Sequence, residues 1–325
     1  MLAFRFLAKL CVAIGLLQAH AALAQGSGPQ KVSFYFAAHQ DDWQLFMNPS
    51  AFVDVTESDT KTVFVHLTAG DAGSGKTNRE RKHPFYAARE HGAEAAIRFM
   101  ADQDNLPVEK TAVRQFINGH AIQRVSYRNT VTYFLRLPDG HPSGSGFRET
   151  GYQSLERFAN GKIETLTAID DSSVYRGWQD LVTMLRAIVD EERGVSPSVQ
   201  LNVAELDPRI NPDDHSDHLM TAKAALEAAS GLSCARRLHY VDYASARLPE
   251  NLSPQQRDME AAVFAVTSAG IRALDHATAW RRYDRSYVGR NYFRVEEGIG
   301  GCEAPARGHL QAIAGRPKNT NPTDR

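Results

Sequence analysis

Residues 32–42 read VSFYFAAHQDD, a near-continuous apolar run that leads directly into four polar side chains. Such a run is typical of a β-strand that is buried on both faces, as the central strands of a parallel sheet are. A second run of this kind, TVFVHLTA, spans residues 62–69. In an open α/β sheet, ligands bind in the crevice beyond the carboxyl ends of the strands. The opening stretch therefore predicts a parallel sheet and also the place of a binding site.

Helical and strand-like patterns alternate along the rest of the chain. Helical patterns occupy residues 84–101, 175–193 and 218–230 and a long capped segment from Ser253, and further strand-like runs occupy 198–206 and 237–243. Asn118-Gly119 separates strand-like runs and signals a β-hairpin. Residues 138–161, rich in Gly, Pro and Ser, indicate a long functional loop or an insertion. We therefore expect an α/β, Rossmann-like fold with a mainly parallel sheet flanked by helices and a β-hairpin excursion around 111–137.

The first 24 residues have the pattern of a signal peptide. Arg5 and Lys9 precede a short apolar stretch at 10–17, and Ala22-Leu23-Ala24 fits the small-x-small cleavage rule. We expect cleavage near Ala24/Gln25 and an exported protein, periplasmic or secreted. Residues 25–302 are expected to form a single domain, and 303–325 have the composition of a disordered tail.

Composition excludes several classes of protein. The 325 residues are 42% hydrophobic and 23% charged, as in ordinary globular proteins. A net charge of −1 provides no basic field for nucleic acid, and no interior apolar run reaches the roughly 18 residues of a membrane span. Outside the signal segment the cysteines are Cys234 and Cys302. These two could pair in an oxidising compartment, but the sequence does not show whether their geometry permits it.

Two polar clusters carry the chemistry. His39-Gln40-Asp41-Asp42 follows the first buried strand, and residues 213–218, DDHSDH, lie between a strand and an Ala-rich helix. Together they place three histidines and several carboxylates at strand ends. Either cluster alone is more often a polar turn or a helix cap. The pair favours a divalent transition metal, and imidazole with carboxylate ligands favours zinc over calcium or magnesium.

One motif conflicts with its surroundings. Residues 70–77, GDAGSGKT, match the phosphate-binding pattern G-x-x-x-x-G-K-[ST] and follow an apolar strand. A phosphate-binding loop must run directly into a helix. Here the polar residues 78–83 intervene before Pro84. We therefore interpret the stretch as a glycine-rich loop at a strand end, and a nucleotide-binding protein is the least favoured reading.

The two clusters resemble the signatures of one known family. Residues 38–42, AHQDD, resemble the AHPDD signature of the PIG-L/LmbE family of zinc-dependent N-acetylglucosaminyl deacetylases, and residues 215–218, HSDH, resemble its HxDH signature. The resemblance covers about residues 31–245. Residues 68–71 and Leu137-Pro138-Asp139-Gly140 look like two of the family's loops, and Arg89 lies in what looks like its R-x-x-E-x-x-A-A helix. There are two departures: Gln40 replaces a proline, and Gly92 stands where the helix usually has glutamate.

The resemblance implies a role for each matching residue. His39, Asp42 and His218 would be the ligands of one zinc ion per chain, although another divalent transition metal is possible. Asp41 would be the general base, His215 would stabilise the oxyanion or protonate the leaving amine, and Asp217 would orient His215. Arg89 and Asp139 would bind the substrate.

The function expected is removal of the N-acetyl group from an N-acetylated sugar, glycoside or polysaccharide by metal-activated water. The alternative is an exported, non-catalytic carbohydrate-binding domain with a structural metal.

Overall fold

The computed structural model describes residues 28–74, 82–102 and 108–303. The predicted signal peptide, all but the first residue of the predicted tail, and Gly75 to Thr77 of the glycine-rich motif lie outside the described residues. Within these residues, no helix is long and apolar enough to cross a membrane.

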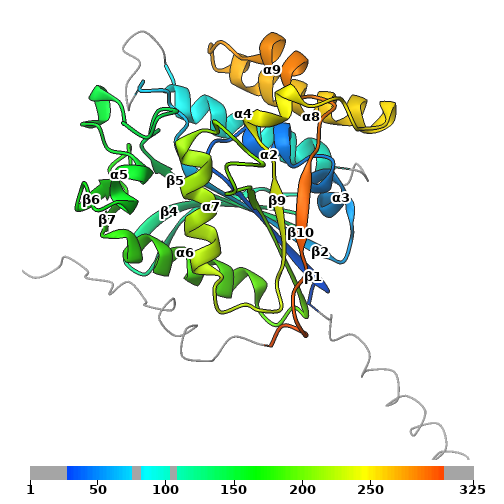
Figure 1. The fold of residues 1–325 in the computed structure, drawn as a ribbon, viewed down its shortest axis with the longest axis horizontal. Helices are drawn as coiled ribbons and strands as arrows, with labels where there is room; N and C mark the ends of the chain where they lie inside the picture. The colour runs from blue at the N-terminus through cyan, green and yellow to red at the C-terminus, as the bar shows by residue number, and fades with distance from the viewer. Residues whose placement is uncertain (1–27, 75–81, 103–107, 304–325) are drawn as a thin grey trace, which may run out of the picture.

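An eight-stranded sheet forms the centre of the molecule (Figure 1). In spatial order its strands are β10 (Phe293–Glu296), β9 (Arg236–Tyr240), β8 (Ser198–Ala204), β1 (Lys31–Ala37), β2 (Thr60–Thr68), β5 (Thr130–Leu137), β4 (His120–Tyr127) and β3 (Thr111–Ile117). The five strands from β9 to β5 are parallel, and β10, β4 and β3 are antiparallel to their neighbours. The predicted α/β fold with a mainly parallel sheet is confirmed.

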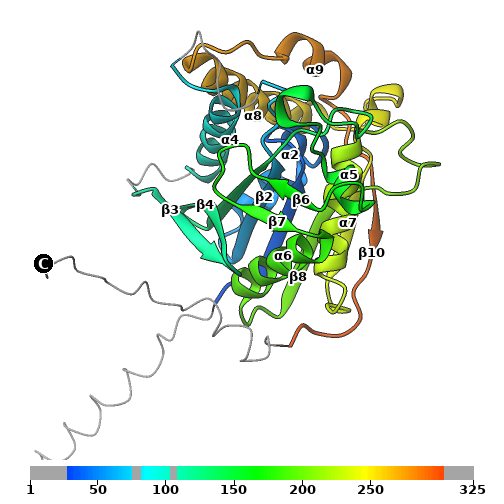
Figure 2. The same ribbon diagram turned by 90° about the vertical axis from the view of Figure 1, so that its left-hand side faces the viewer.

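The expected hairpin is part of this sheet. Asn118 and Gly119 both have positive φ, 48° and 86°, and join β3 to β4. The last strand-like run of the predicted excursion, β5, returns to pair in parallel with β2. The region from 111 to 137 therefore widens the sheet on one side. A separate two-stranded hairpin, β6 (Thr165–Thr167) with β7 (Val174–Arg176), lies beside α5 (Leu155–Ala159) and after the short helix η1 (Arg148–Thr150) (Figure 2).

Helices cover both faces of the sheet, and alternate side chains of β1 point into the two cores that the helices form with it. Val32, Phe34 and Phe36 point into the core beneath α6 (Trp178–Arg193) and α7 (Ser216–Ala228). Tyr35 and Ala37 point into the opposite core. The second core is covered by α2 (Asp42–Phe46), α3 (Ser50–Thr56), α4 (Phe85–Ala101) and α8 (Pro254–Ala273), with α9 (Trp280–Ser286) packed on α8.

Helices α4 and α8 cross at a pair of glycines. A Cβ atom added to Gly92 would lie 2.6 Å from the carbonyl oxygen of Thr267, and one added to Gly270 would lie 2.8 Å from the Cα of Gly92. Any side chain at Gly92 would therefore push the two helices apart. This close approach accounts for the glycine where the family's helix usually has glutamate.

Cys234 and Cys302 form a disulfide, with Cα atoms 5.2 Å apart. The bond ties the segment after β10 to the loop before β9. The sequence left this pairing open, because it does not show whether two residues 68 positions apart come within reach of each other.

A buried carboxyl group on α8 gives the fold a pH dependence. Glu260 is fully buried and its Oε2 accepts a hydrogen bond from the Gly289 amide at 2.6 Å. Burial raises its pKa from 4.5 to about 9, against the opposing effects of the Gly289 amide, Arg257 and Arg290. The folded protein therefore holds a proton that the unfolded chain releases between these two pH values. The contribution of Glu260 to the free energy of unfolding is therefore complete below pH 4.5 and is lost as the pH rises towards 9.

Replacing Glu260 with glutamine should remove this loss, because the amide keeps an acceptor for Gly289 and carries no charge. We expect Glu260→Gln to raise the Tm relative to the unsubstituted protein by an amount that grows from pH 5 to pH 9. The exposed Glu297→Gln serves as the control and should show no such trend. Parallel Tm curves for Glu260→Gln and the unsubstituted protein would show that Glu260 is ionised in the fold.

Candidate metal centre and active site

The candidate site lies at the carboxyl ends of the central parallel strands. The loop after β1 and the first residue of α2 supply residues 39–42, and the loop after β8 together with the first turn of α7 supplies residues 213–218. Because β1 and β8 are direct neighbours in the sheet, the two loops meet. The loops after β2, β5 and β9 add Gly70, Asp139 and Asp242.

Three buried side chains form a compact triangle of donor atoms. His39 Nδ1 lies 3.2 Å from His218 Nε2 and 3.3 Å from Asp42 Oδ1, and His218 Nε2 lies 3.3 Å from the same oxygen. Tetrahedral zinc has bonds of about 2.0–2.2 Å, which separates its ligand atoms by roughly 3.3–3.6 Å. The triangle and its two nitrogen donors and one oxygen donor fit one face of such a site.

The electrostatics of the triangle favour positive charge. Burial would raise the pKa of Asp42, but His218 and His39 hold it well below its ordinary value. Burial would lower the pKa of His39, yet Asp42, Asp217 and Asp139 raise it to about 10. The pKa of His218 is also raised, since Asp42 and Asp214 outweigh burial. The carboxylates that raise the pKa of these two histidines would also stabilise a dication bound between them.

Two further carboxylates contact the outer nitrogen of His218. His218 Nδ1 lies 2.9 Å from Asp214 Oδ1 and 3.3 Å from Asp242 Oδ2. Burial and the neighbouring Asp214 raise the pKa of Asp242 well above its ordinary value. Sequence reasoning missed Asp242. The available signal was its place two residues after the end of β9, the same position relative to its strand that His39 has after β1.

Asp214 should matter for metal affinity, because a carboxylate on the outer nitrogen fixes the ring and strengthens it as a ligand. We expect Asp214→Asn to weaken zinc binding about 10–100-fold, while activity at saturating zinc is largely kept. Competition with a chromophoric chelator measures the affinity. Asp213→Asn is the matched control, since that side chain is exposed and pairs with Arg247. Unchanged affinity in Asp214→Asn would show that Asp242 alone orients the ring.

Asp41 is held by Arg89. Arg89 Nη2 forms an ion pair with Asp41 Oδ1, and Arg89 Nε donates to Gln40 Oε1 at 2.9 Å. Gln40 in turn donates to the carbonyl oxygen of Thr68 at 3.1 Å. A Cβ at Gly70, whose φ is +54°, would lie 2.8 Å from Gln40 Oε1 and 2.9 Å from Arg89 Nε. The replacement of the signature's proline by Gln40 therefore adds a side-chain contact, because the Gln40 amide holds Arg89 in place.

His215 is the N-cap residue of α7, and its Nδ1 accepts a hydrogen bond from the Asp217 amide at 3.1 Å. The proton of the neutral ring is therefore on Nε2. Burial, together with His39 and His218, pushes the pKa of His215 far below its usual range, so the neutral ring is the stable form.

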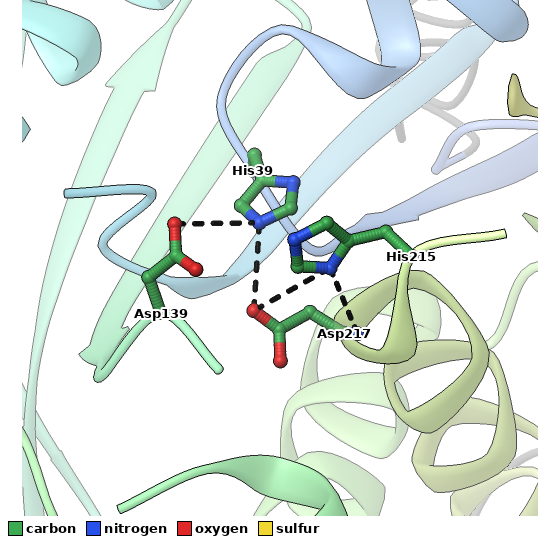
Figure 3. Close-up of side chains that lie close together, drawn as sticks. All are labelled: His39, Asp139, His215 and Asp217. Atoms are coloured by element: carbon green, nitrogen blue, oxygen red, sulfur yellow. Dashed lines mark hydrogen bonds and ion pairs between the residues drawn. The ribbon is translucent and has the colours of Figure 1, made fainter. Parts of the chain in front are cut away.

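The Asp217 carboxylate faces both His39 and His215 (Figure 3). Its Oδ2 is 3.5 Å from His39 Nε2 and 3.9 Å from His215 Nδ1, and it accepts a hydrogen bond from the Gly140 amide at 2.8 Å. The expected partner was His215 alone, but the carboxylate is closer to His39. It also joins α7 to the loop after β5.

Asp139 lies on the other side of His39 (Figure 3). Its Oδ2 is 3.9 Å from His39 Nε2 and accepts a hydrogen bond from the Ala72 amide at 3.2 Å, and its Oδ1 accepts one from the His141 amide at 3.0 Å. The carboxylate therefore orders the loops after β2 and β5 where they face the metal ligands.

A cavity of about 220 Å³ opens over these residues. Its polar wall contains His39, Asp41, Asp42, Arg89, Asp139 and His215. Its apolar wall includes Phe46, Phe147, Tyr243 and Tyr283. The structure thus brings every predicted site residue either to the wall of this cavity or, for Asp217 and His218, to the side chains directly behind it.

The sequence matches one known protein family. Residues 34–229 match the family model described as PIG-L, GlcNAc-PI de-N-acetylase. Among solved structures, N,N'-diacetylchitobiose deacetylase from Pyrococcus horikoshii, complexed with its inhibitor MPG, is 15% identical with a TM-score of 0.43, covering 83% of this chain and 84% of that one. A TM-score this low supports no argument about function. No curated protein matches the chain. On the family match, the chain belongs to the PIG-L family of de-N-acetylases, hydrolases that act on the amide bond of N-acetylated sugars.

Proposed function

We propose that this protein is an exported zinc enzyme that removes the acetyl group from an N-acetylated amino sugar within a glycoside or polysaccharide. The observation that carries the proposal is the triangle of His39, Asp42 and His218 donor atoms, with edges of 3.2–3.3 Å, beside the carboxylate of Asp41. Sites with three protein ligands and an open position are typical of catalytic rather than structural zinc. This favours a hydrolase over the non-catalytic binding domain.

Zinc held by the triangle would lower the pKa of a water molecule towards about 7 and polarise the acetamide carbonyl. Asp41 accepts the proton of the attacking water, since its carboxylate lines the cavity beside the triangle. The neutral His215 donates a hydrogen bond from its Nε2–H group to the oxyanion that develops on the carbonyl oxygen. The proton taken by Asp41 passes to the leaving nitrogen. The carbon–nitrogen bond then breaks to give acetate and the free amine.

Arg89 and Asp139 position the substrate and the base. Burial would lower the pKa of Arg89, but Asp41 and Asp42 raise it, so the guanidinium stays charged. It holds Asp41 in place through one nitrogen and lines the cavity, where it can donate to a sugar hydroxyl. Asp139 offers an acceptor for a second hydroxyl on the opposite side of His39.

The disulfide between Cys234 and Cys302 supports an oxidising compartment, as does the signal-peptide pattern of residues 1–24. Fractionation of cells that produce the full chain tests this part. We expect the mature protein in the periplasm or medium, beginning near Gln25. Recovery of the unprocessed chain in the cytoplasm would contradict it.

The catalytic proposal is tested by an acetate-release assay of the zinc-loaded protein against N-acetylated sugars, glycosides and polysaccharides. We expect release of acetate together with a free amine from at least one substrate. Saccharide binding without acetate release from any of them would instead support the non-catalytic alternative.

A further inference from the structure

The active-site cavity is completed by residues from outside the family match. That match ends at residue 229, whereas Tyr243, Arg282 and Tyr283 also line the cavity. Tyr243 contacts the metal-site rings directly, with its ring centroid 5.0 Å from that of His218. The C-terminal segment therefore contributes to the shape of the site in a way that the shared family core does not determine.

Aromatic packing fixes this segment in place. Phe264 of α8 stacks on Trp280 and Tyr283 of α9, with centroid distances of 5.4 and 6.3 Å. Tyr287, just after α9, stacks on Tyr243 at 5.7 Å. The position of α9 beside the active site is therefore set by packing against both α8 and the tyrosine that contacts His218.

A second, larger cavity of about 670 Å³ lies between α8 and α9. Arg272, Arg281 and Arg282 line it together with Ser268 and Trp280, and no acidic residue does. Arg282 lines both cavities, so the two lie next to each other with its side chain between them. The guanidinium of Arg282 lies over the ring of Tyr283 at 4.6 Å and donates to its hydroxyl at 2.8 Å.

The three arginines that line this larger cavity, Arg272, Arg281 and Arg282, are exposed. Within residues 28–74, 82–102 and 108–303, none of its three arginines forms an ion pair with a carboxylate. Ser268 also lines the cavity, but its hydroxyl oxygen is buried. The cavity thus offers a ligand three exposed cationic side chains.

We propose that the cavity between α8 and α9 binds an oxyanion of the substrate while the acetamido group occupies the smaller cavity. The substrate is then an acidic N-acetylated glycan that carries carboxylate, sulfate or phosphate close to the sugar that is deacetylated. Guanidinium groups suit all three anions, because their fork of donors matches the spacing of two oxyanion oxygens. This assignment rests on the proposed function for the acetamido end and extends it along the glycan.

Binding to the metal-free protein tests the proposal separately from catalysis. Two tetrasaccharides of equal length serve as probes: tetra-N-acetylchitotetraose, which is neutral, and a hyaluronan tetrasaccharide, in which every second sugar carries a carboxylate. Calorimetry at low salt should show the acidic tetrasaccharide binding about tenfold more tightly, as charge-assisted contacts imply, and the advantage should shrink in high salt. Equal affinities for the two would overturn the proposal.

Substitutions locate the effect. Arg272→Gln/Arg281→Gln should abolish the advantage of the acidic tetrasaccharide, whereas Arg285→Gln, an exposed arginine of α9 outside both cavity walls, should keep it. Equal losses in both proteins would show a non-specific charge effect and refute the site. Inorganic phosphate is the third probe: if it binds and neither tetrasaccharide does, the cavity takes a free anion and the substrate assignment is wrong. If anion-dependent binding persists but no acetate is released, the proposed function fails and the anion site stands.

Discussion

His39→Ala is expected to lose its bound zinc and to lower kcat/KM for acetate release by more than about 10³-fold. The substitution removes one corner of the donor triangle and leaves Asp42 and His218 as the remaining pair. Two ligands cannot hold zinc as three do, and without the metal neither the water nor the carbonyl is activated. Zinc per chain, measured by atomic emission after gel filtration, should fall from about one to near zero.

A second buried histidine provides the control. His120 lies in β4, stacks on Tyr175 with centroids 4.2 Å apart and contacts Asp180 at 2.9 Å, away from the candidate site. His120→Ala should keep its zinc and its activity even if its Tm falls. If His39→Ala kept one zinc per chain and full activity, the metal would bind elsewhere and the assignment of the triangle would be wrong.

Asp41→Asn should separate metal binding from turnover. The asparagine leaves His39, Asp42 and His218 in place, so zinc binding should be nearly unchanged. It cannot accept the proton of the attacking water, and loss of a general base typically costs about 10²–10⁴-fold in rate. We therefore expect kcat to fall by that factor with one zinc per chain retained.

The substitution also breaks the ion pair with Arg89, so the folded state must be checked by its Tm. Asp213→Asn provides the same chemical change on an exposed carboxylate near the site and should leave kcat unchanged. Activity retained in Asp41→Asn would assign the base role to another group, and loss of the zinc would show that Asp41 belongs to the metal site itself.

The sequence alone predicts the parallel sheet and the main residues of the site because both depend on local patterns. An apolar run followed at once by His39 and Asp42 defines a buried strand and its carboxyl end. The cluster at 213–218 follows β8 in the same way. Neighbouring parallel strands bring their ends together, so the meeting of His39 with His218 follows from the pattern once β1 and β8 are adjacent.

The rest depends on contacts between distant segments. Nothing near Gln40 in the sequence indicates that its side chain joins Thr68 to Arg89. From the sequence, Gly92 is only a departure from a motif. The structure explains the glycine, because Thr267 on another helix leaves no room for a side chain there. In the sequence, Arg282 is only one of several arginines in a polar stretch. Its place at the active site depends on the packing of α9 against Phe264 of α8.

The most direct test of the account follows acetate release through removal and return of the metal. The purified protein is assayed, treated with a chelator, and assayed again after addition of zinc up to one equivalent per chain. We predict that activity disappears on chelation and returns in proportion to zinc, reaching its maximum at about one ion per chain, while His39→Ala recovers none. Full activity in the metal-free protein would contradict the central claim that His39, Asp42 and His218 hold a catalytic zinc.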